Sequence, residues 1–147
     1  MRKFRFQRGQ SLFEVVVAIA ISALVVTAIV SLATNSIQNT SYSRDKTLAS
    51  GYVEEAMEWL RQERDNNVEF KTKATTTAGK SYCLDDLSTW PALSDCTSDQ
   101  FIGDTNFKRT LSFPYYNEDY VEARITVFWK DSKGTHEVSS STDLSTK

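Results

Sequence analysis

A single carboxylate stands at the start of the longest apolar run in the chain. Glu14 is followed by nineteen residues without a charge, Val15 to Ala33, and is preceded by a basic segment that ends at Gly9. An ionised side chain deep in a bilayer costs roughly 3 kcal/mol, so Glu14 requires a compensating cation. The nearest new cation would be the α-amino group created by cutting the chain before Gln10, four residues away.

Two cysteines are the second candidate for chemistry. Cys83 and Cys96 both follow the apolar run, and an exported segment lies in a compartment where disulfides persist. We therefore expect them to pair, with two free buried thiols as the alternative. The bond would close a loop of about fourteen residues and stabilise the fold by roughly 3 kcal/mol.

No residue pattern indicates catalysis. His136 is the one histidine and lies beside Glu137, without a serine, cysteine or metal partner at motif spacing. Nucleophile motifs, glycine-rich phosphate loops and paired catalytic carboxylates are absent from the sequence. We expect no enzyme activity and no cofactor.

Five aspartates offer oxygen ligands in the loop region, but their spacing matches no EF-hand loop. We interpret them as solvated loop acids and keep a calcium site as the alternative; they are Asp85, Asp86, Asp95, Asp99 and Asp104.

The charge distribution separates the first nine residues from the rest. Four of the seventeen Lys and Arg residues and none of the nineteen acids lie there. The chain from Gln10 onward therefore carries thirteen cations and nineteen acids, a net charge of −6. An acidic exported domain argues against nonspecific nucleic-acid binding.

The apolar run is long enough to cross a bilayer, because about twenty apolar residues of helix span the hydrocarbon core. The basic segment before it is retained on the cytoplasmic side, so the chain after Thr34 is expected to be exported. An ordinary secretory signal is the alternative, because Ser31-Leu32-Ala33 resembles a signal-peptidase site. That alternative gives Glu14 and Gly9 no role.

Beyond the apolar run, residues 34–65 predict an amphipathic continuation of the same helix. Apolar side chains recur at three- and four-residue spacing: Leu48, Tyr52, Val53, Ala56, Met57 and Leu60. Charged residues, among them Glu54, Glu58 and Arg61, fall on the opposite side. We expect a helix from Ser11 to about Arg64 that stops near Asp65-Asn66-Asn67.

Residues 66–147 predict a globular head. Lys71 to Lys80 is expected to be an exposed loop. From Phe107 to Phe113 and from Val121 to Trp129 apolar residues alternate with polar ones, which predicts two strands. Asp131 to Gly134 predicts a hairpin turn that leads to a third strand over 135–139. The predicted fold is α+β: a long N-terminal helix whose first half is transmembrane, packed by its second half against a three-stranded antiparallel meander.

The segment Arg8-Gly9-Gln10-Ser11-Leu12-Phe13-Glu14, followed by VVVAIAI, resembles the class III signal of type IV pilins and type II secretion pseudopilins. It is most similar to minor pilins and minor pseudopilins. The resemblance implies that a prepilin peptidase cuts after Gly9 and methylates the new terminus at Gln10, and that Glu14 is required for filament assembly. Gln10 departs from the commoner phenylalanine or methionine, and the absence of a proline from Val15 to Ala33 argues against a bulk subunit.

By this resemblance, the chain divides into a cleaved leader 1–9, a membrane and filament-core helix 10–33, an amphipathic helix 34–65 and a head 66–147. The implied function is a structural filament subunit. Its partners are prepilin peptidase, other pilin or pseudopilin subunits, an inner-membrane assembly platform and membrane lipid. Its location is the bacterial cytoplasmic membrane, with a cytoplasmic N-terminus, and then an extracellular or periplasmic filament. An adhesin or DNA-uptake pilin is an alternative, for which Trp90, Tyr115 and Tyr116 are candidate exposed aromatics.

Overall fold

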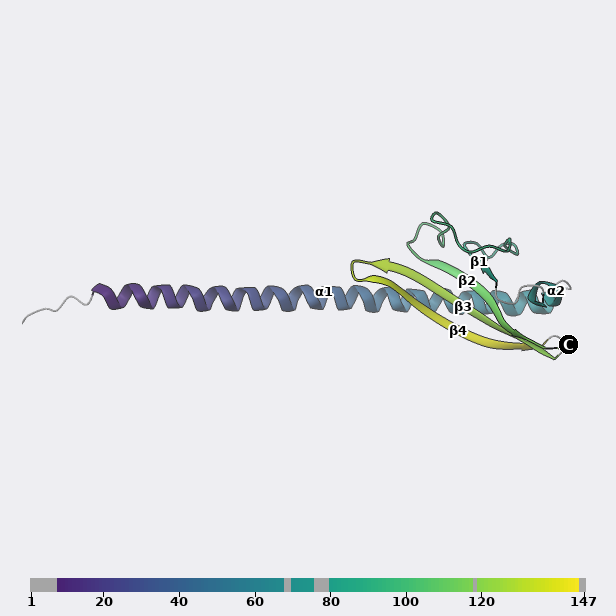
Figure 1. Ribbon diagram of the computed structural model, residues 1–147, viewed down its shortest axis with the longest axis horizontal. Coiled ribbons are helices and arrows are strands. Elements are labelled where there is room, and N and C mark those ends of the chain that lie inside the picture. Colours follow the sequence, from purple (N-terminus) through teal and green to yellow (C-terminus); the bar gives the residue numbers. More distant parts are fainter. Residues whose placement is uncertain (1–7, 68–69, 76–79, 118, 146–147) are drawn as a thin grey trace, which may run out of the picture. The chain divides into compact units, whose positions relative to one another are not determined.

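The computed structural model describes residues 8–67, 70–75, 80–117 and 119–145. Residues 1–7 of the predicted leader lie outside this part of the chain. Two compact units are present, Met1–Ser43 and Arg44–Lys147, and each is described by itself. The elements are α1 (Arg8–Asn66), α2 (Phe70–Thr75), β1 (Ser81–Cys83), β2 (Lys108–Tyr116), β3 (Tyr120–Asp131) and β4 (Gly134–Ser145) (Figure 1).

The first unit contains the apolar part of α1. The helix begins at Arg8, three residues before the predicted Ser11. This part of α1 is long and apolar enough to span a membrane, and none of its most apolar window is buried inside the protein. The hydroxyls of Ser22 and Thr34 donate to the carbonyls of Ala18 and Val30, at 2.8 Å and 2.9 Å. Such bonds satisfy polar side chains within the helix, as a lipid environment requires.

The second unit contains the amphipathic end of α1, whose buried stripe differs from the prediction at one place. The side chains of Ala49, Val53, Ala56, Met57 and Leu60 are buried. Leu48 was predicted to share this stripe but is 41% exposed. Ala49 lies at four- and seven-residue spacing from Val53 and Ala56, so it occupies the centre of the buried face, and Leu48 falls one position outside it.

The helix ends as predicted. α1 stops at Asn66, and the Asn67 backbone N–H donates to the Glu63 carbonyl at 2.8 Å. The Asn67 side-chain amide donates to the Glu63 carboxylate at 2.9 Å, which adds a side-chain contact at the helix terminus.

The head contains a four-stranded antiparallel sheet in the order β1-β2-β3-β4, not the predicted three strands. The additional strand, β1, pairs with the middle of β2 through Ser81 and Ser112. Pro114 lies inside β2 instead of ending it, next to an irregular register between Ser112 and Tyr115. A proline is tolerated there because β1 no longer pairs with β2 beyond Ser112, and an unpaired edge does not need its N–H.

The predicted alternation in β2 and β3 is confirmed. Arg109, Leu111 and Phe113 of β2 are buried while the residues between them are partly exposed. In β3 the buried positions are the five predicted ones, Val121, Ala123, Ile125, Val127 and Trp129. These faces and the stripe of α1 form one hydrophobic core. The fold is therefore α+β, with the helix packed against a small antiparallel sheet.

The segment between α1 and β1 corrects the predicted loop. Residues 70–75 form a short helix, α2, while residues 76–79 of the predicted loop are not among those described. Phe70 and Ala74, four residues apart, are 3% and 1% exposed. Their burial against the core favours a helical turn that the polar composition of this segment did not indicate.

Candidate functional site

The predicted processing and assembly residues lie on the first turns of α1. Gly9, Gln10 and Glu14 all belong to this helix. Gln10 and Glu14 are four residues apart, so they lie on the same side of the helix and are separated by about 6 Å along its axis. An α-amino group created at Gln10 would therefore lie within reach of the Glu14 carboxylate.

Glu14 has no charged neighbour in sequence. It is the one charged residue between Gln10 and Ser43, and its side chain is exposed in the structure. After a cut before Gln10, the same carboxylate would lie four residues from the new amine.

The surface of α1 near Glu14 is largely apolar from Leu12 onward. Leu12, Phe13 and Leu24 are each 71% exposed, and the other large apolar side chains of this part of α1 are exposed as well. A continuous apolar surface of this extent is covered by lipid or by other proteins. Glu14 is therefore the one ionisable side chain from Gln10 to Ser43 that could direct the packing of this part of α1.

In the head, the structure joins Cys83 and Cys96 by a disulfide with a Cα–Cα distance of 4.8 Å. The bond links β1 to the loop between β1 and β2. The Leu84 N–H next to it donates to the Arg109 carbonyl at 2.8 Å. The covalent loop is thereby attached to β2.

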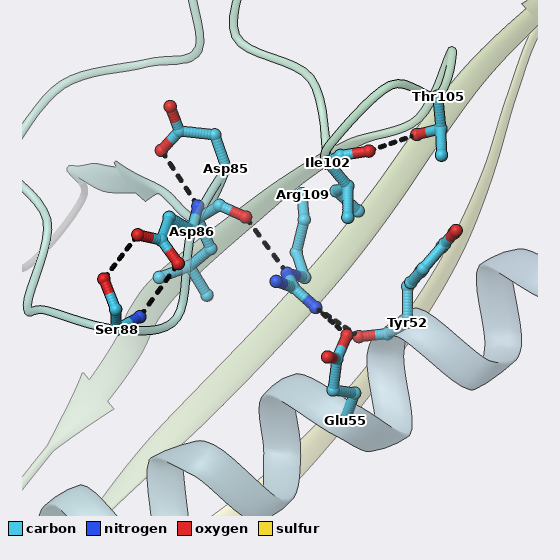
Figure 2. Close-up of polar contacts among 9 residues, drawn as sticks. Tyr52, Glu55, Asp85, Asp86, Ser88, Ile102, Thr105 and Arg109 are labelled. Carbon is cyan, nitrogen blue, oxygen red and sulfur yellow. Dashed lines mark hydrogen bonds and ion pairs between the residues drawn. The ribbon is translucent and has the colours of Figure 1, made fainter.

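The structure also contains a polar centre that the sequence reading did not identify. Arg109 on β2 is 2% exposed. Its Nε donates to the Leu84 carbonyl at 3.1 Å, and its Nη1 donates to the Tyr52 carbonyl at 3.0 Å and to the Glu55 carboxylate at 2.9 Å (Figure 2). Burial lowers the pKa of Arg109, and Glu55 opposes that shift. This side chain ties α1 to β2 and to the segment after β1.

The sequence contains one indication of this centre, because Arg109 is a cation at an inward-facing position of a strand in which buried and exposed residues alternate. Arg109 follows Phe107 and precedes Leu111 at two-residue spacing, so its burial was implied by the alternation. A buried guanidinium must find several acceptors. The acceptors themselves, on α1 and after β1, are distant in sequence and were not predictable.

The five candidate calcium ligands do not converge. Within the described residues, no three His, Cys, Asp or Glu side chains lie close enough together to hold a metal ion. The Asp86 carboxylate accepts hydrogen bonds from the Ser88 hydroxyl and from its N–H, which lowers the pKa of Asp86. Asp95 and Asp99 accept from the hydroxyls of Ser81 and Ser98.

His136 takes part in a local contact at the β3–β4 hairpin. Its ring lies 5.3 Å from that of Trp129, and its Nε2 lies 2.9 Å from the Asp131 carboxylate. Hydrogen bonding to His136 lowers the pKa of Asp131. Asp131 also accepts from the N–H groups of Lys133 and Gly134, which adopts the predicted positive φ of 135°.

The three candidate exposed aromatics separate into two groups. Trp90 is half-buried, with its ring 5.4 Å from Trp59 and 5.6 Å from Tyr82. Tyr115 and Tyr116 are exposed at the end of β2, and Tyr115 lies 5.5 Å from Tyr120. Trp90 is therefore part of the head core.

Comparison with known proteins supports the assignment of the N-terminal segment. Residues 4–30 match the family model of the prokaryotic N-terminal methylation motif. No curated protein and no solved structure matches the chain. The match contains Gly9, Gln10 and Glu14 and ends within the apolar part of α1. The chain therefore carries the class III methylation signal of type IV pilins, at the N-terminus of a pilin-like α+β fold.

Proposed function

We propose that this chain is a minor pilin or minor pseudopilin, a structural subunit of a type IV pilus or of a type II secretion-like filament. The observation that carries the proposal is the methylation motif at residues 4–30, joined to a helix in which Glu14 is the one charge from Gln10 to Ser43. The match to this motif also favours the proposal over a secretory signal cut before Thr34.

In this proposal, the precursor is anchored in the cytoplasmic membrane by residues 10–33, with its N-terminus in the cytoplasm and its head exported. Prepilin peptidase cuts after Gly9 and methylates Gln10. The mature chain then leaves the lipid and packs its helix among those of other subunits. The final location is an extracellular or periplasmic filament.

Glu14 directs this step by pairing with the amine of Gln10, in its own or a neighbouring subunit. Both groups leave the lipid for a helical bundle of low dielectric constant. Buried ion pairs are better supported as devices that specify register than as sources of net stability. The pair would therefore set the axial position of each subunit, while the apolar side chains supply the burial.

A minor role is favoured over a bulk role by the continuity of the helix. Many major pilins have a helix-breaking proline midway along the apolar segment, whereas α1 contains no proline from Arg8 to Asn66. We propose that the chain is a substrate of the processing enzyme and no enzyme itself. It would need no cofactor, and its charge of −6 after Gly9 disfavours nucleic acid as a partner.

A ligand-binding head is the second candidate. The exposed pair of rings, Tyr115 and Tyr120, favours it, because exposed aromatic side chains often mark binding surfaces. The double variant Tyr115→Ala/Tyr120→Ala would then assemble normally but reduce cell adhesion. Unchanged adhesion would leave the purely structural role.

The test of the proposed function is the incorporation of Glu14→Ala into filaments. Removal of a charge from an apolar segment does not hinder insertion, so we expect normal processing and membrane levels. Loss of one partner of a buried pair costs about 3 to 5 kcal/mol, which should reduce incorporation by two orders of magnitude or more. Glu14→Asp should be intermediate because it keeps the charge but shortens the reach.

The matched control is Glu58→Ala, which removes an exposed carboxylate from the other end of the same helix. The measurement is the amount of each variant in sheared filaments relative to the membrane fraction. Wild-type incorporation of Glu14→Ala would contradict the proposed role of this carboxylate. Equal loss in both variants would indicate a general effect of charge.

A further inference from the structure

Among the described residues, no other strand pairs with the outer side of β4. β4 is the outermost strand in the order β1-β2-β3-β4, and it pairs with β3 without a register shift from Gly134 to Ser145 (Figure 1). Asp131 and Gly134 close a two-residue turn, so the even-numbered residues of β4 bond to β3. The backbone groups of the odd-numbered residues therefore point away from the sheet.

The opposite edge of the sheet is blocked. β1 is only three residues long and is attached to the disulfide loop. Beyond it, β2 contains Pro114 and an irregular register. Short strands, prolines and bulges are the features by which proteins prevent strand pairing at an edge.

β4 is twelve residues long and pairs with β3 without a register shift. It contains no proline, lysine or arginine, and its centre is the run Ser139-Ser140-Ser141-Thr142. Its charged edge residues are the acids Glu137 and Asp143. Small side chains leave the backbone accessible to another strand, so β4 is the edge at which a further strand can pair.

A groove lies on the helix side of β4. It has a volume of about 320 Å³ and is lined by residues of α1, among them Val53, Met57 and Arg61, and by Val138 and Ser140 of β4. Side chains of a strand added to β4 would point alternately toward this groove and away from it. The helix-facing side of such a strand therefore requires residues small enough for this groove, whose lining also contains the charged side chains of Glu54 and Arg61.

The other side of β4 is acidic. Glu137 and Asp143 are exposed and face away from the helix, as all odd-numbered residues of this strand do. Opposite charges on directly paired strands are favourable and like charges are not. The strand that pairs here is therefore expected to carry Lys or Arg on its outward side.

We propose that the β4 edge binds an extended segment of a different exported subunit, with basic residues on its outward side and small residues on its groove side. The inference rests on the proposed function, because it places the chain in an assembly of several subunits. Main-chain hydrogen bonds would supply the affinity, and the alternating side chains would supply specificity.

A second copy of this chain fits the edge less well. A closed dimer of β4 edges pairs them antiparallel about a two-fold axis. That axis would reverse the direction of the 44–66 segment of α1 in one copy relative to the other. Both chains, however, must lead back from residue 44 to the same membrane, so a different protein is the expected partner.

The test is site-specific photo-crosslinking of the full-length chain in its native host. A benzophenone amino acid at position 139 or 141 reports on the open edge, and the same residue at the exposed position 92 is the control. We expect an adduct with a different protein from 139 and 141, mapped by mass spectrometry to an extended basic segment. It should fall at least tenfold from both positions in Glu137→Lys/Asp143→Lys, and from position 141 in Ser139→Pro, which removes an outward N–H.

The matched charge control is Asp99→Lys/Asp104→Lys, which makes the same change of net charge on exposed loop residues and should leave the adduct intact. An adduct between two copies of this chain, an equal yield from position 92, or an adduct insensitive to the edge variants would each overturn the proposal. The mature N-terminus is read from the same samples. If the chain is cut before Gln10 but gives no adduct, only the proposal for the β4 edge is contradicted. If the adduct forms on a chain that is not cut, only the proposed filament role is contradicted.

Discussion

The two ends of α1 place the same residue type in opposite surroundings. Leu24 in the first unit is 71% exposed, whereas Leu60 in the second is fully buried. Both lie in one α-helix with the same backbone hydrogen bonding. The difference shows that the helix is built for two environments: its N-terminal end must be covered by lipid or other subunits, and its C-terminal end is covered by its own sheet.

Polar groups are satisfied differently in the two regions. In the first unit, the hydroxyls of Ser22 and Thr27 donate hydrogen bonds to carbonyls of the same helix, four residues earlier. In the second, Tyr52 and Glu55 accept hydrogen bonds from Arg109 on β2. The N-terminal end thus keeps Glu14 as its one directional group, while the other end is fixed to the head by specific contacts.

The largest effect expected from this comparison is at Leu60. Leu60→Ala leaves a cavity under the sheet and should lower the free energy of unfolding by about 3 kcal/mol. Leu24→Ala removes the same atoms from an exposed position and should leave head stability unchanged. The measurement is chemical denaturation of the full-length chain in detergent, followed by near-UV circular dichroism. Similar losses of stability in both variants would contradict the claim that only the C-terminal end of α1 stabilises the head.

Arg109 gives the next largest effect. Arg109→Met should destabilise the head by about 2 kcal/mol, because the carbonyls of Leu84 and Tyr52 lose a buried donor. Glu55 is 57% exposed, so water replaces its partner, and Glu55→Gln should cost less than about 1 kcal/mol. Equal costs in the same denaturation assay would mean that the ion pair, and not the carbonyl contacts, holds α1 to β2.

The smallest effect concerns acid stability at the β3–β4 hairpin. The pKa of Asp131 is lowered by His136, so this carboxylate stabilises the folded state above its unfolded pKa of about 4, and the contribution is lost as pH falls through the lower folded pKa. Below about pH 4, the free energy of unfolding of Asp131→Asn should therefore fall less steeply with decreasing pH than that of the wild-type protein. Asp104→Asn, on an exposed loop, is the control for the loss of one carboxylate.

Features with a local period were predictable from the sequence. The alternation from Lys108 to Phe113 and the turn before Gly134 depend on neighbouring residues, and both are confirmed. β1 and α2 were missed because three and six residues contain too little of a period to recognise. They form because tertiary contacts hold them, through Cys83 and Phe70.

The two candidate sites differ in the same way. Gly9, Gln10 and Glu14 lie within one short segment, and the roles expected of them follow from the resemblance of that segment to the class III signal. The burial of Arg109 was predictable from the strand alternation, but its hydrogen bonds were not. Its acceptors Tyr52 and Glu55 lie more than fifty positions earlier, on another element. The open edge of β4 likewise depends on which strands pair on either side.

The most direct test of the account is the N-terminus of the mature protein. Intact mass and N-terminal sequencing of the chain purified from its native membrane should give a protein that begins with N-methylated Gln10. Gly9→Val should leave an uncut precursor in the membrane. A mature terminus at Thr34 in the wild-type protein would establish a secretory signal instead and contradict the filament role.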